Sequence, residues 1–321
     1  MRTKLLEMLL NGQYISGQEI SDKLGISRTA VWKHIKSLKE DGYDIDSQFG
    51  KGYRLLRMNK YLTPEKIKLG LKCRLLAGDI VHFHEIGSTN EEAKKIAEKG
   101  YSEGTLVIAE KQTGGKGRMG RHWQSPATGL WSSIVLKPSI PPRDAPQLAL
   151  LVAAALRTVL SKEFGIDAKI KWPNDLLVDN KKICGILTEM KGEMDKISYI
   201  VNGVGVNVNQ EIEDFPEELA NTATSLKIIK EMEIDRLLLL QKYLEALEEF
   251  YLDFLENGFE KARKICIENS HTIGNIVTIY SGDKEYTGKA IGLGSDGALI
   301  VNINNQEIPF YGGEVSLRGK I

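Results

Sequence analysis

The stretch from Glu110 to Trp123 reads EKQTGGKGRMGRHW and contains four glycines and four fixed cations against one acid. Glycine lets the backbone turn freely and approach a ligand closely. Lysine and arginine direct hydrogen-bond donors at anionic oxygens. An apolar strand predicted over residues 105–109 leads directly into this segment. We therefore expect a loop that folds around a phosphate-bearing ligand rather than a segment of packed core.

The residues around this loop exclude two common nucleotide-binding motifs. Residues 115–120 match the G-x-G-x-x-G pattern of dinucleotide-binding folds, but residues 121–126 open no helix. No acid follows between Glu110 and Asp144, although that fold needs one there. The G-x-x-x-x-G-K-[ST] pattern of a P-loop is absent from the chain. A mobile surface loop without a ligand is the alternative that the sequence leaves open.

Composition indicates an ordinary globular protein whose positive charge is local. The 321 residues carry no net charge, yet residues 1–60 hold eleven Lys and Arg against seven Asp and Glu. The start of the chain lacks the apolar segment of a signal peptide, and the longest apolar run, 148–156, is too short to span a membrane. The three cysteines show no paired spacing. We expect a cytoplasmic protein with no membrane partner.

The N-terminal segment has the pattern of a helix-turn-helix. Ser16 and Glu19 form a capping box for a helix over residues 17–24, which Gly25 ends. A second helix follows over residues 27–40. Two short β-prone runs joined by a glycine-rich turn come next, and a hairpin in this position makes a winged helix-turn-helix.

One face of the second helix is basic and polar, as in helices that lie in the DNA major groove. The residues predicted to contact DNA are Arg28, Thr29, Trp32, Lys33 and Lys36 on the helix and Lys51 and Arg54 on the wing. The alternative is a small helical bundle whose solvated face is basic by chance. The hairpin favours DNA binding.

Residues beyond this module predict two further domains. Strands interrupted by long helices indicate an α+β mixed sheet, and short strands with frequent turns after about residue 273 indicate a small β-barrel. We place the domains at residues 1–62, 63–270 and 271–321. In the central domain, Asp175 ends a predicted strand and is suited to a phosphate-bound Mg²⁺. Lys182 is either a pocket cation or a solvent-facing lysine of an edge strand.

Several separate stretches together resemble the biotin–protein ligases. They are residues 87–90 (GSTN), 112–123, 171–175 (KWPND), Lys182 with Gly185, 203–207, and 312–318 (GGEVSLR). With the winged helix-turn-helix, the whole chain is similar to the bifunctional bacterial form, which is also the biotin operon repressor. One departure is Lys116, where the family commonly has arginine, so its contact through the side chain or the backbone stays open.

The resemblance implies an enzyme that forms biotinyl-5′-AMP from biotin and ATP, with Mg²⁺, and biotinylates a lysine of a carrier subunit of acetyl-CoA carboxylase. It implies biotin contacts at Ser88, Thr89, Asn90, Gln112, Lys116, Gly117, Arg118, Lys182, Gly185 and Gly203. It implies ATP contacts at Arg118, Arg121, Trp123, Asn174, Asp175, Lys182 and Asn207. Arg118, Arg121, Asp175 and Lys182 would be catalytic, and Asp175 would serve the magnesium.

The adenylate-bound form would dimerise and bind operator DNA. Two alternatives remain: a ligand-sensing transcription factor without ligase activity, and a lipoate–protein ligase.

Overall fold

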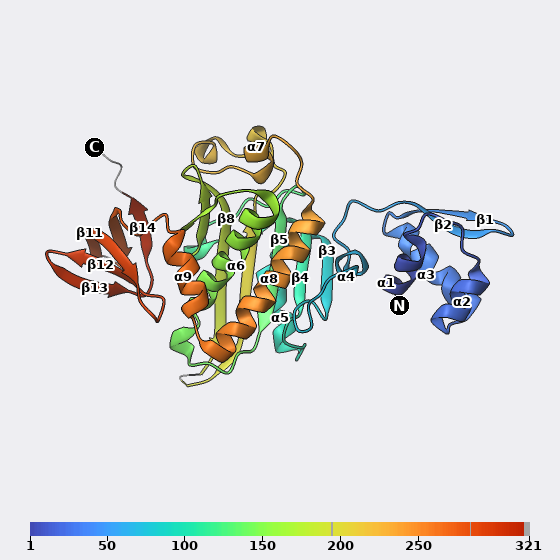
Figure 1. Cartoon of the computed structure of the whole chain (residues 1–321), viewed down its shortest axis with the longest axis horizontal. Coiled ribbons are helices and arrows are strands. Elements are labelled where there is room, and N and C mark those ends of the chain that lie inside the picture. The colour runs from blue at the N-terminus through green and yellow to red at the C-terminus, as the bar shows by residue number, and fades with distance from the viewer. Residues whose placement is uncertain (194, 283, 318–321) are drawn as a thin grey trace. The chain divides into compact units, whose positions relative to one another are not determined.

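The computed structural model describes residues 1–193, 195–282 and 284–317. The chain divides into two compact units, Met1–Leu71 and Lys72–Ile321, each of which is described by itself (Figure 1).

The first unit contains three helices followed by a hairpin and a short helix. Its elements are α1 (Arg2–Leu9), α2 (Gly17–Leu24), α3 (Arg28–Glu40), β1 (Asp44–Gln48), β2 (Gly52–Arg57) and α4 (Pro64–Lys68). The Ser16 hydroxyl caps α2 by accepting a hydrogen bond from the backbone N–H of Glu19, and Ser27 caps α3 through Ala30. Gly25 follows α2 in the left-handed conformation, with φ +66°. The predicted winged helix-turn-helix is therefore confirmed.

The second unit is built on a seven-stranded sheet in the order β3-β4-β5-β9-β8-β7-β6. Its strands are β3 (Ile80–Ile86), β4 (Leu106–Gln112), β5 (Leu130–Leu136), β6 (Lys169–Lys171), β7 (Asp175–Val178), β8 (Lys181–Gly192) and β9 (Ile197–Val206). Strands β3 and β4 pair in parallel, and the other neighbours pair antiparallel. This confirms the predicted α+β mixed sheet.

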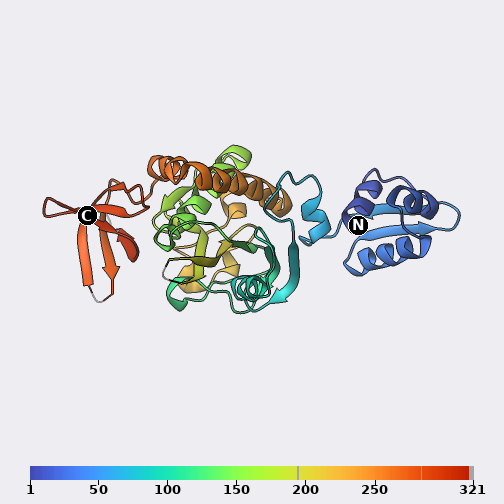
Figure 2. The same ribbon diagram turned by 90° about the horizontal axis from the view of Figure 1, so that it is seen from below.

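Helices lie on both faces of this sheet. The helices of the unit are α5 (Thr89–Glu98), α6 (Gln147–Phe164), α7 (Leu226–Lys230), α8 (Arg236–Asn257) and α9 (Glu260–Glu268). Figure 2 shows α5 and α8 on opposite sides of the sheet. Helix α6 and the residues just before it are long and apolar enough to cross a membrane, but 72% of the most apolar window is buried inside the unit. It is the core helix that packs between the sheet and the outer helices.

The alternation of side chains along β9 creates the floor of a site. Val201 faces α5 and packs in a cluster with Ala93 and Ile96. Successive residues of a strand point to opposite faces, so Gly203 and Gly205 lie on the same face as Val201. Because neither glycine has a side chain, other parts of the protein can approach this face of the sheet closely.

The C-terminal strands form an open sheet. The strands are β10 (Ile276–Ser281), β11 (Lys284–Leu293), β12 (Leu299–Ile303), β13 (Gln306–Phe310) and β14 (Glu314–Leu317), in the order β13-β12-β11-β10-β14. Within residues 284–317, β13 and β14 do not pair, so the structure does not show the closed barrel that the sequence predicts. Short strands and turns indicate a small β-domain, but closure depends on strand pairing that this pattern does not specify. Arg318, predicted as the end of the last strand, lies outside the described residues.

Helix α5 begins at Thr89, with Ser88 at the N-cap, and α6 begins at Gln147. The sequence does not predict α7 or α9, because both are short and lack a sustained apolar stripe.

Glu248 on α8 holds the segment that leads into the second unit. Its buried carboxylate accepts hydrogen bonds from the backbone N–H groups of Arg74, Leu75 and Leu76, at 2.8, 2.7 and 2.8 Å. We expect Glu248→Ala to lower the free energy of unfolding of this unit by about 3 kcal/mol, because three backbone donors, including that of the buried Leu76, lose a charged acceptor. Urea denaturation monitored by circular dichroism measures this change.

The neighbouring Glu249 supplies the matched control. Its side chain is 70% exposed and pairs with Lys261 at the surface. Glu249→Ala should lower the free energy of unfolding by less than about 1 kcal/mol. Equal destabilisation by the two substitutions would show that Glu248 has no special role.

Candidate functional sites

A cavity of about 1090 Å³ lies over the glycine-rich floor of the central sheet. Its volume is at the upper end of the range for small-molecule sites, which leaves room for two substrates. Every residue predicted to contact biotin or ATP lines it: Ser88, Thr89, Asn90, Gln112, Lys116, Gly117, Arg118, Arg121, Trp123, Asn174, Asp175, Lys182, Gly185, Gly203 and Asn207. Segments more than a hundred residues apart in the sequence thus meet at one site.

One corner of the cavity is lined by uncharged polar side chains, of which Ser88, Thr89 and Asn90 are buried. The Gln112 Oε1 atom accepts hydrogen bonds from the backbone N–H and the hydroxyl of Thr89, at 2.8 and 3.1 Å. The Asn90 Oδ1 atom accepts from Ser133 Oγ at 2.6 Å, and Asn90 Nδ2 donates to Glu189 Oε2 at 2.9 Å. Sequence reasoning misses Ser133 and Glu189, because both lie on other strands. This network fixes donors and acceptors that suit an amide-like group.

Gly203 is required by the close packing of this corner. A Cβ atom at Gly203 would lie 2.0 Å from Asn90 Oδ1. Gly205, two residues further, would place a Cβ atom 2.5 Å from the indole nitrogen of Trp123. The sequence indicates that something approaches these strand glycines closely, and the structure identifies the approaching groups as Asn90 and Trp123.

The glycine-rich loop folds back on itself as a narrow hairpin. The Gly117 N–H donates to the Arg121 carbonyl at 2.7 Å, and the Trp123 N–H donates to the Gly115 carbonyl at 2.9 Å. Met119 occupies the tip with φ +57° and is 79% exposed. The turn therefore presents a hydrophobic side chain to solvent while Arg118 and Trp123 line the cavity.

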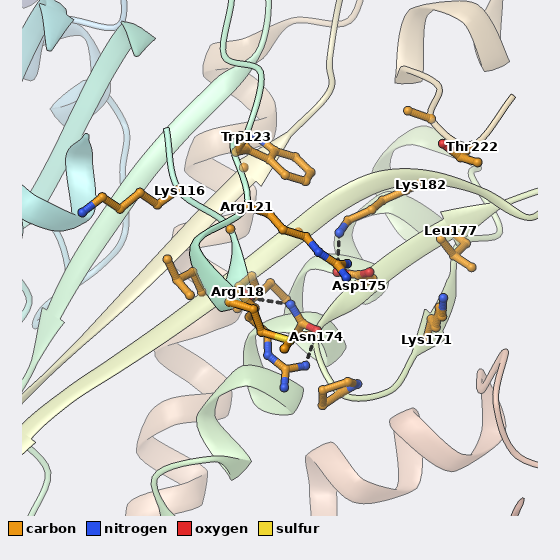
Figure 3. A pocket seen from close by; sticks show the side chains of 18 of the residues that line it. Lys116, Arg118, Arg121, Trp123, Lys171, Asn174, Asp175, Leu177, Lys182 and Thr222 are labelled. Atoms are coloured by element: carbon orange, nitrogen blue, oxygen red, sulfur yellow. Dashed lines mark hydrogen bonds and ion pairs between the residues drawn. The ribbon is translucent and has the colours of Figure 1, made fainter. Parts of the chain in front are cut away.

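The cations of the site differ in how they are neutralised. Lys182 Nζ lies 2.8 Å from Asp175 Oδ1, and Arg121 Nη2 lies 2.5 Å from Glu314 Oε2. Figure 3 shows the side chains of Lys182 and Asp175 pointing toward each other. The carboxylate of Glu314 raises the pKa of Arg121, mainly through this hydrogen bond. Both pairs bring fixed charge of both signs to the cavity.

Arg118 is a half-buried cation without a carboxylate in contact. Its guanidinium donates to Asn174 Oδ1 at 3.1 Å and to the Gly313 carbonyl at 3.2 Å. Burial lowers the pKa of Arg118 and outweighs the attraction of Asp175 and Glu314. Among the described residues, no carboxylate oxygen lies within 4 Å of this guanidinium. An anionic ligand would therefore meet a positive charge that no carboxylate contacts.

Trp123 covers the glycine floor. Its ring would lie 2.8 Å from a Cβ atom at Gly185, and the Lys182 ammonium lies 5.0 Å from the ring centroid. The Trp123 indole nitrogen is buried and has no hydrogen-bond partner within the described part of the chain. Lys182 is thus a cavity cation and not an edge-strand lysine, since β8 lies between β7 and β9.

Three predicted ligand residues use their side chains to hold protein segments. Lys116 Nζ pairs with Glu91 Oε1 of α5 at 2.6 Å, and Figure 3 shows it pointing away from Asp175. The Asn174 Nδ2 atom donates to the Ile186 carbonyl at 2.8 Å, and the Asn207 Nδ2 atom donates to the Thr224 carbonyl at 3.1 Å. Their direct ligand contacts stay predictions. In residues 1–193, 195–282 and 284–317, no group of three or more His, Cys, Asp or Glu side chains is placed so that it could hold a metal ion.

The first unit presents the predicted basic surface. Arg28, Thr29, Lys33 and Lys36 are exposed on α3, whereas Val31, Ile35 and Leu38 pack inside. Trp32 is exposed, and the Lys36 ammonium lies 5.6 Å from its ring centroid. On the wing, the Arg54 guanidinium stacks 4.6 Å from the ring of Tyr14, and Lys51 lies 5.6 Å from the same ring. The geometry suits a helix in a major groove beside a basic wing.

Comparison with family models assigns each part of the chain. Residues 83–207 match the biotin/lipoate A/B protein ligase family. Residues 2–54 match a helix-turn-helix domain, and residues 272–318 match the C-terminal domain of biotin protein ligases.

Known relatives match over nearly the whole length. The bifunctional ligase/repressor BirA of Bacillus subtilis is 38% identical over 99% of this chain and 98% of that protein. The chain belongs to the family of bifunctional biotin–protein ligases and repressors. A second bifunctional ligase/repressor, BirA of Escherichia coli, is 32% identical over 98% of this chain and 96% of that protein.

A solved biotin protein ligase has the same fold. The enzyme from Aquifex aeolicus, in complex with biotin and ATP, superposes with a TM-score of 0.65 and 30% identity over 75% of this chain and 99% of that one. The family membership of this ligase/repressor thus agrees with the two-substrate cavity and with the separate basic unit.

Proposed function

We propose that this chain joins biotin to ATP to form biotinyl-5′-AMP and then transfers the biotinyl group to a lysine of a biotin carrier protein in the cytoplasm. The observation that carries the proposal is one cavity that unites the neutral polar corner with Arg118, which no carboxylate contacts among the described residues, and with the Lys182–Asp175 pair. We assign DNA binding to a domain at residues 1–62 and catalysis to a domain at residues 63–270. Residues 271–321 form a separate C-terminal domain.

The first step needs charge stabilisation more than covalent chemistry by the protein. A carboxylate oxygen of biotin bonds to the α-phosphorus of ATP, the bond to the bridging oxygen breaks, and pyrophosphate leaves with the electron pair. Arg118 and Lys182 stabilise the negative charge on the reacting phosphate, with Arg121 on the nucleotide side and Asp175 orienting Lys182. The substrate supplies its own nucleophile, so no catalytic serine or cysteine is required.

The neutral corner fits the ureido ring of biotin. Thr89, Asn90 and Gln112 offer fixed donors and acceptors, with Ser88 beside them and Gly203 as the floor. Lys116, Gly117 and Gly185 would border the acyl chain and the carboxylate. Trp123 would cover the adenine, with Asn174 and Asn207 near the nucleotide. A loop closed over the adenylate would exclude water, which otherwise hydrolyses it.

Transfer follows from the same adenylate. A deprotonated lysine amine of the carrier attacks the acyl carbon, the bond to the phosphate oxygen breaks, and AMP leaves with the electron pair. The amine nitrogen releases one proton to solvent as the amide forms. Lys182 lies where it can neutralise the phosphate of departing AMP.

Magnesium fits this site only as a companion of ATP. Asp175 offers a carboxylate, but its Oδ1 atom is engaged with Lys182 at 2.8 Å. Mg²⁺ often binds through one carboxylate, several waters and substrate phosphates. We therefore assign Asp175 as the residue that would reach ATP-bound Mg²⁺, which adds positive charge at the phosphates.

The test of substrate class is competition between biotin and lipoate. Formation of acyl-adenylate from radiolabelled ATP should require biotin and should resist an excess of lipoate. Preferential use of lipoate would make the chain a lipoate ligase. Binding of biotin without adenylate formation would leave a ligand-sensing transcription factor.

The second part of the proposal is repression. Bound biotinyl-5′-AMP would order the glycine-rich loop and promote a homodimer through the central sheet. Two winged helix-turn-helix domains would then contact a two-fold operator. Electrophoretic mobility shifts with operator DNA should show tighter binding with biotin plus ATP than with either alone. Equal binding without them would contradict the corepressor role.

Lys33 on α3 provides the test of the DNA-binding surface. We expect Lys33→Ala to weaken operator binding about tenfold at moderate salt and to reduce the slope of log K against log salt by about one. Lys23→Ala is the control, because Lys23 on α2 pairs with Glu19 at 2.8 Å. Fluorescence anisotropy at several salt concentrations measures both variants. Unchanged affinity and slope for Lys33→Ala would remove α3 from the DNA interface.

A further inference from the structure

Lys171 is a cavity cation to which sequence reasoning assigns no role. It is the last residue of β6, at the edge of the central sheet, and it lines the cavity. Unlike Lys182 and Arg121, it has no carboxylate oxygen within 4 Å in the part of the chain that the structure describes. The hydrogen bond from Arg121 is the main cause that lowers the pKa of Glu314, and the charge of Lys171 lowers it further.

Strand pairing puts Lys171 in line with the reaction centre. In the register of the sheet, Lys171 of β6 lies opposite Asp175 of β7, and Asp175 lies opposite Gly185 of β8. Gly185 in turn lies opposite Gly205 of β9. Paired residues of neighbouring strands point to the same face. One row therefore runs from Gly205 under Trp123, through Asp175, to Lys171 at the sheet edge. Figure 3 shows Lys171 and Asp175 among the side chains around the cavity.

The wall beside Lys171 comes from the segment before the C-terminal sheet. The Ile170 N–H donates to the Asn269 carbonyl at 2.8 Å, and the His271 N–H donates to the Ile170 carbonyl at 2.8 Å. His271 lines the cavity, and its Nε2 atom lies 2.8 Å from Asn180 Oδ1. Burial and then Lys171 lower the pKa of His271, which favours the neutral form of the ring. Lys171 therefore carries the positive charge in this corner.

The reaction brings anionic groups for which this charge is suited. Arg118 contacts Asn174, next to Asp175, and serves the reacting α-phosphate in the proposed function. The leaving group of an in-line displacement departs opposite the attacking carboxylate. The biotin corner lies beside Gly203, two residues before Gly205, where the row begins on β9. From there the row leads away from β9, past Asp175, to Lys171 at the sheet edge.

We propose that Lys171 binds the pyrophosphate that leaves during adenylation, at the sheet edge beside His271. The inference rests on the proposed function and deepens it. As the bond between the α-phosphorus and the bridging oxygen breaks, negative charge grows on the departing pyrophosphate. The Lys171 ammonium stabilises that charge without transferring a proton. Lys171 has no part in the later transfer, because pyrophosphate has left by then.

The reverse reaction isolates this role. The full-length chain is supplied with biotinyl-5′-AMP and pyrophosphate, and ATP formation is measured. We expect Lys171→Met to raise the KM for pyrophosphate at least tenfold. Transfer of biotin from supplied biotinyl-5′-AMP to a carrier domain should stay within about twofold of the unsubstituted chain. Lys171→Arg keeps the charge and should restore most of the affinity for pyrophosphate.

Lys169→Met is the matched control on the same strand. Lys169 pairs with Asp167 at the surface and does not line the cavity. It should change neither reaction. An unaltered KM for pyrophosphate in Lys171→Met would overturn the inference, and so would an equal loss of transfer, which would indicate damage to the fold or to adenylate binding. Failure of the unsubstituted chain to form ATP would instead contradict the proposed function itself.

Discussion

Replacing Arg118 by Gln should slow biotinyl-5′-AMP formation by about 10²- to 10³-fold, the range found when a preorganised charge-stabilising donor is removed. Glutamine keeps a hydrogen-bonding group near Asn174 but removes the charge. The guanidinium is half-buried, and burial lowers its pKa because removal from water disfavours the charged form. Among the described residues, no carboxylate contacts it. Its charge is therefore available to the reacting phosphate and is weakly screened by solvent.

Single-turnover measurements of pyrophosphate release separate this effect from substrate binding. The rate at saturating biotin and ATP should fall, since the interaction strengthens as charge develops on the phosphate. Arg157→Gln is the control, because Arg157 pairs with Asp167 and does not line the cavity. If Arg118→Gln released pyrophosphate as fast as Arg157→Gln, the glycine-rich loop would have no place in the chemistry.

The second large effect is expected at Gly203. Gly203→Ala should weaken biotin binding about 10- to 100-fold, because a Cβ atom would lie 2.0 Å from Asn90 Oδ1. Asn90 must then move and lose its bonds to Ser133 and Glu189. Overpacking of this kind costs about 1–3 kcal/mol. Isothermal titration with biotin measures the affinity directly.

A control substitution at a second glycine distinguishes damage to the biotin pocket from loss of folding. Gly292 lies in β11, and a Cβ atom there would meet nothing within 4 Å. Gly292→Ala should bind biotin like the unsubstituted chain. Thermal denaturation of both variants shows whether Gly203→Ala is folded at the titration temperature. Undiminished biotin affinity in folded Gly203→Ala would rule out this corner as the ureido site.

Local signals in the sequence predict much of the fold. Ser16, Ser27 and Gly25 act within one helical turn of their own position, so the helix-turn-helix can be read from neighbouring residues. The glycine-rich loop is equally local, because its composition alone suits an anionic ligand. The strand glycines Gly203 and Gly205 mark a close approach without revealing which group approaches.

Such local signals do not predict contacts between segments that are distant in the sequence. Nothing near Lys116 indicates that it pairs with Glu91, twenty-five residues earlier in the chain. Ser133 joins the polar corner because β5 pairs with β9 opposite Gly203. Lys171 becomes a cavity residue only through the pairing of β6 with β7. These positions depend on strand order and register, which local patterns leave undetermined.

We claim that biotin is activated by ATP in the cavity under the glycine-rich loop. Pyrophosphate release from the purified chain, with biotin and ATP together and with each alone, measures this activation. We predict release only with both substrates, followed by transfer of labelled biotin to one lysine of a carrier domain. Pyrophosphate release that does not depend on biotin, or none with both substrates present, would contradict the claim.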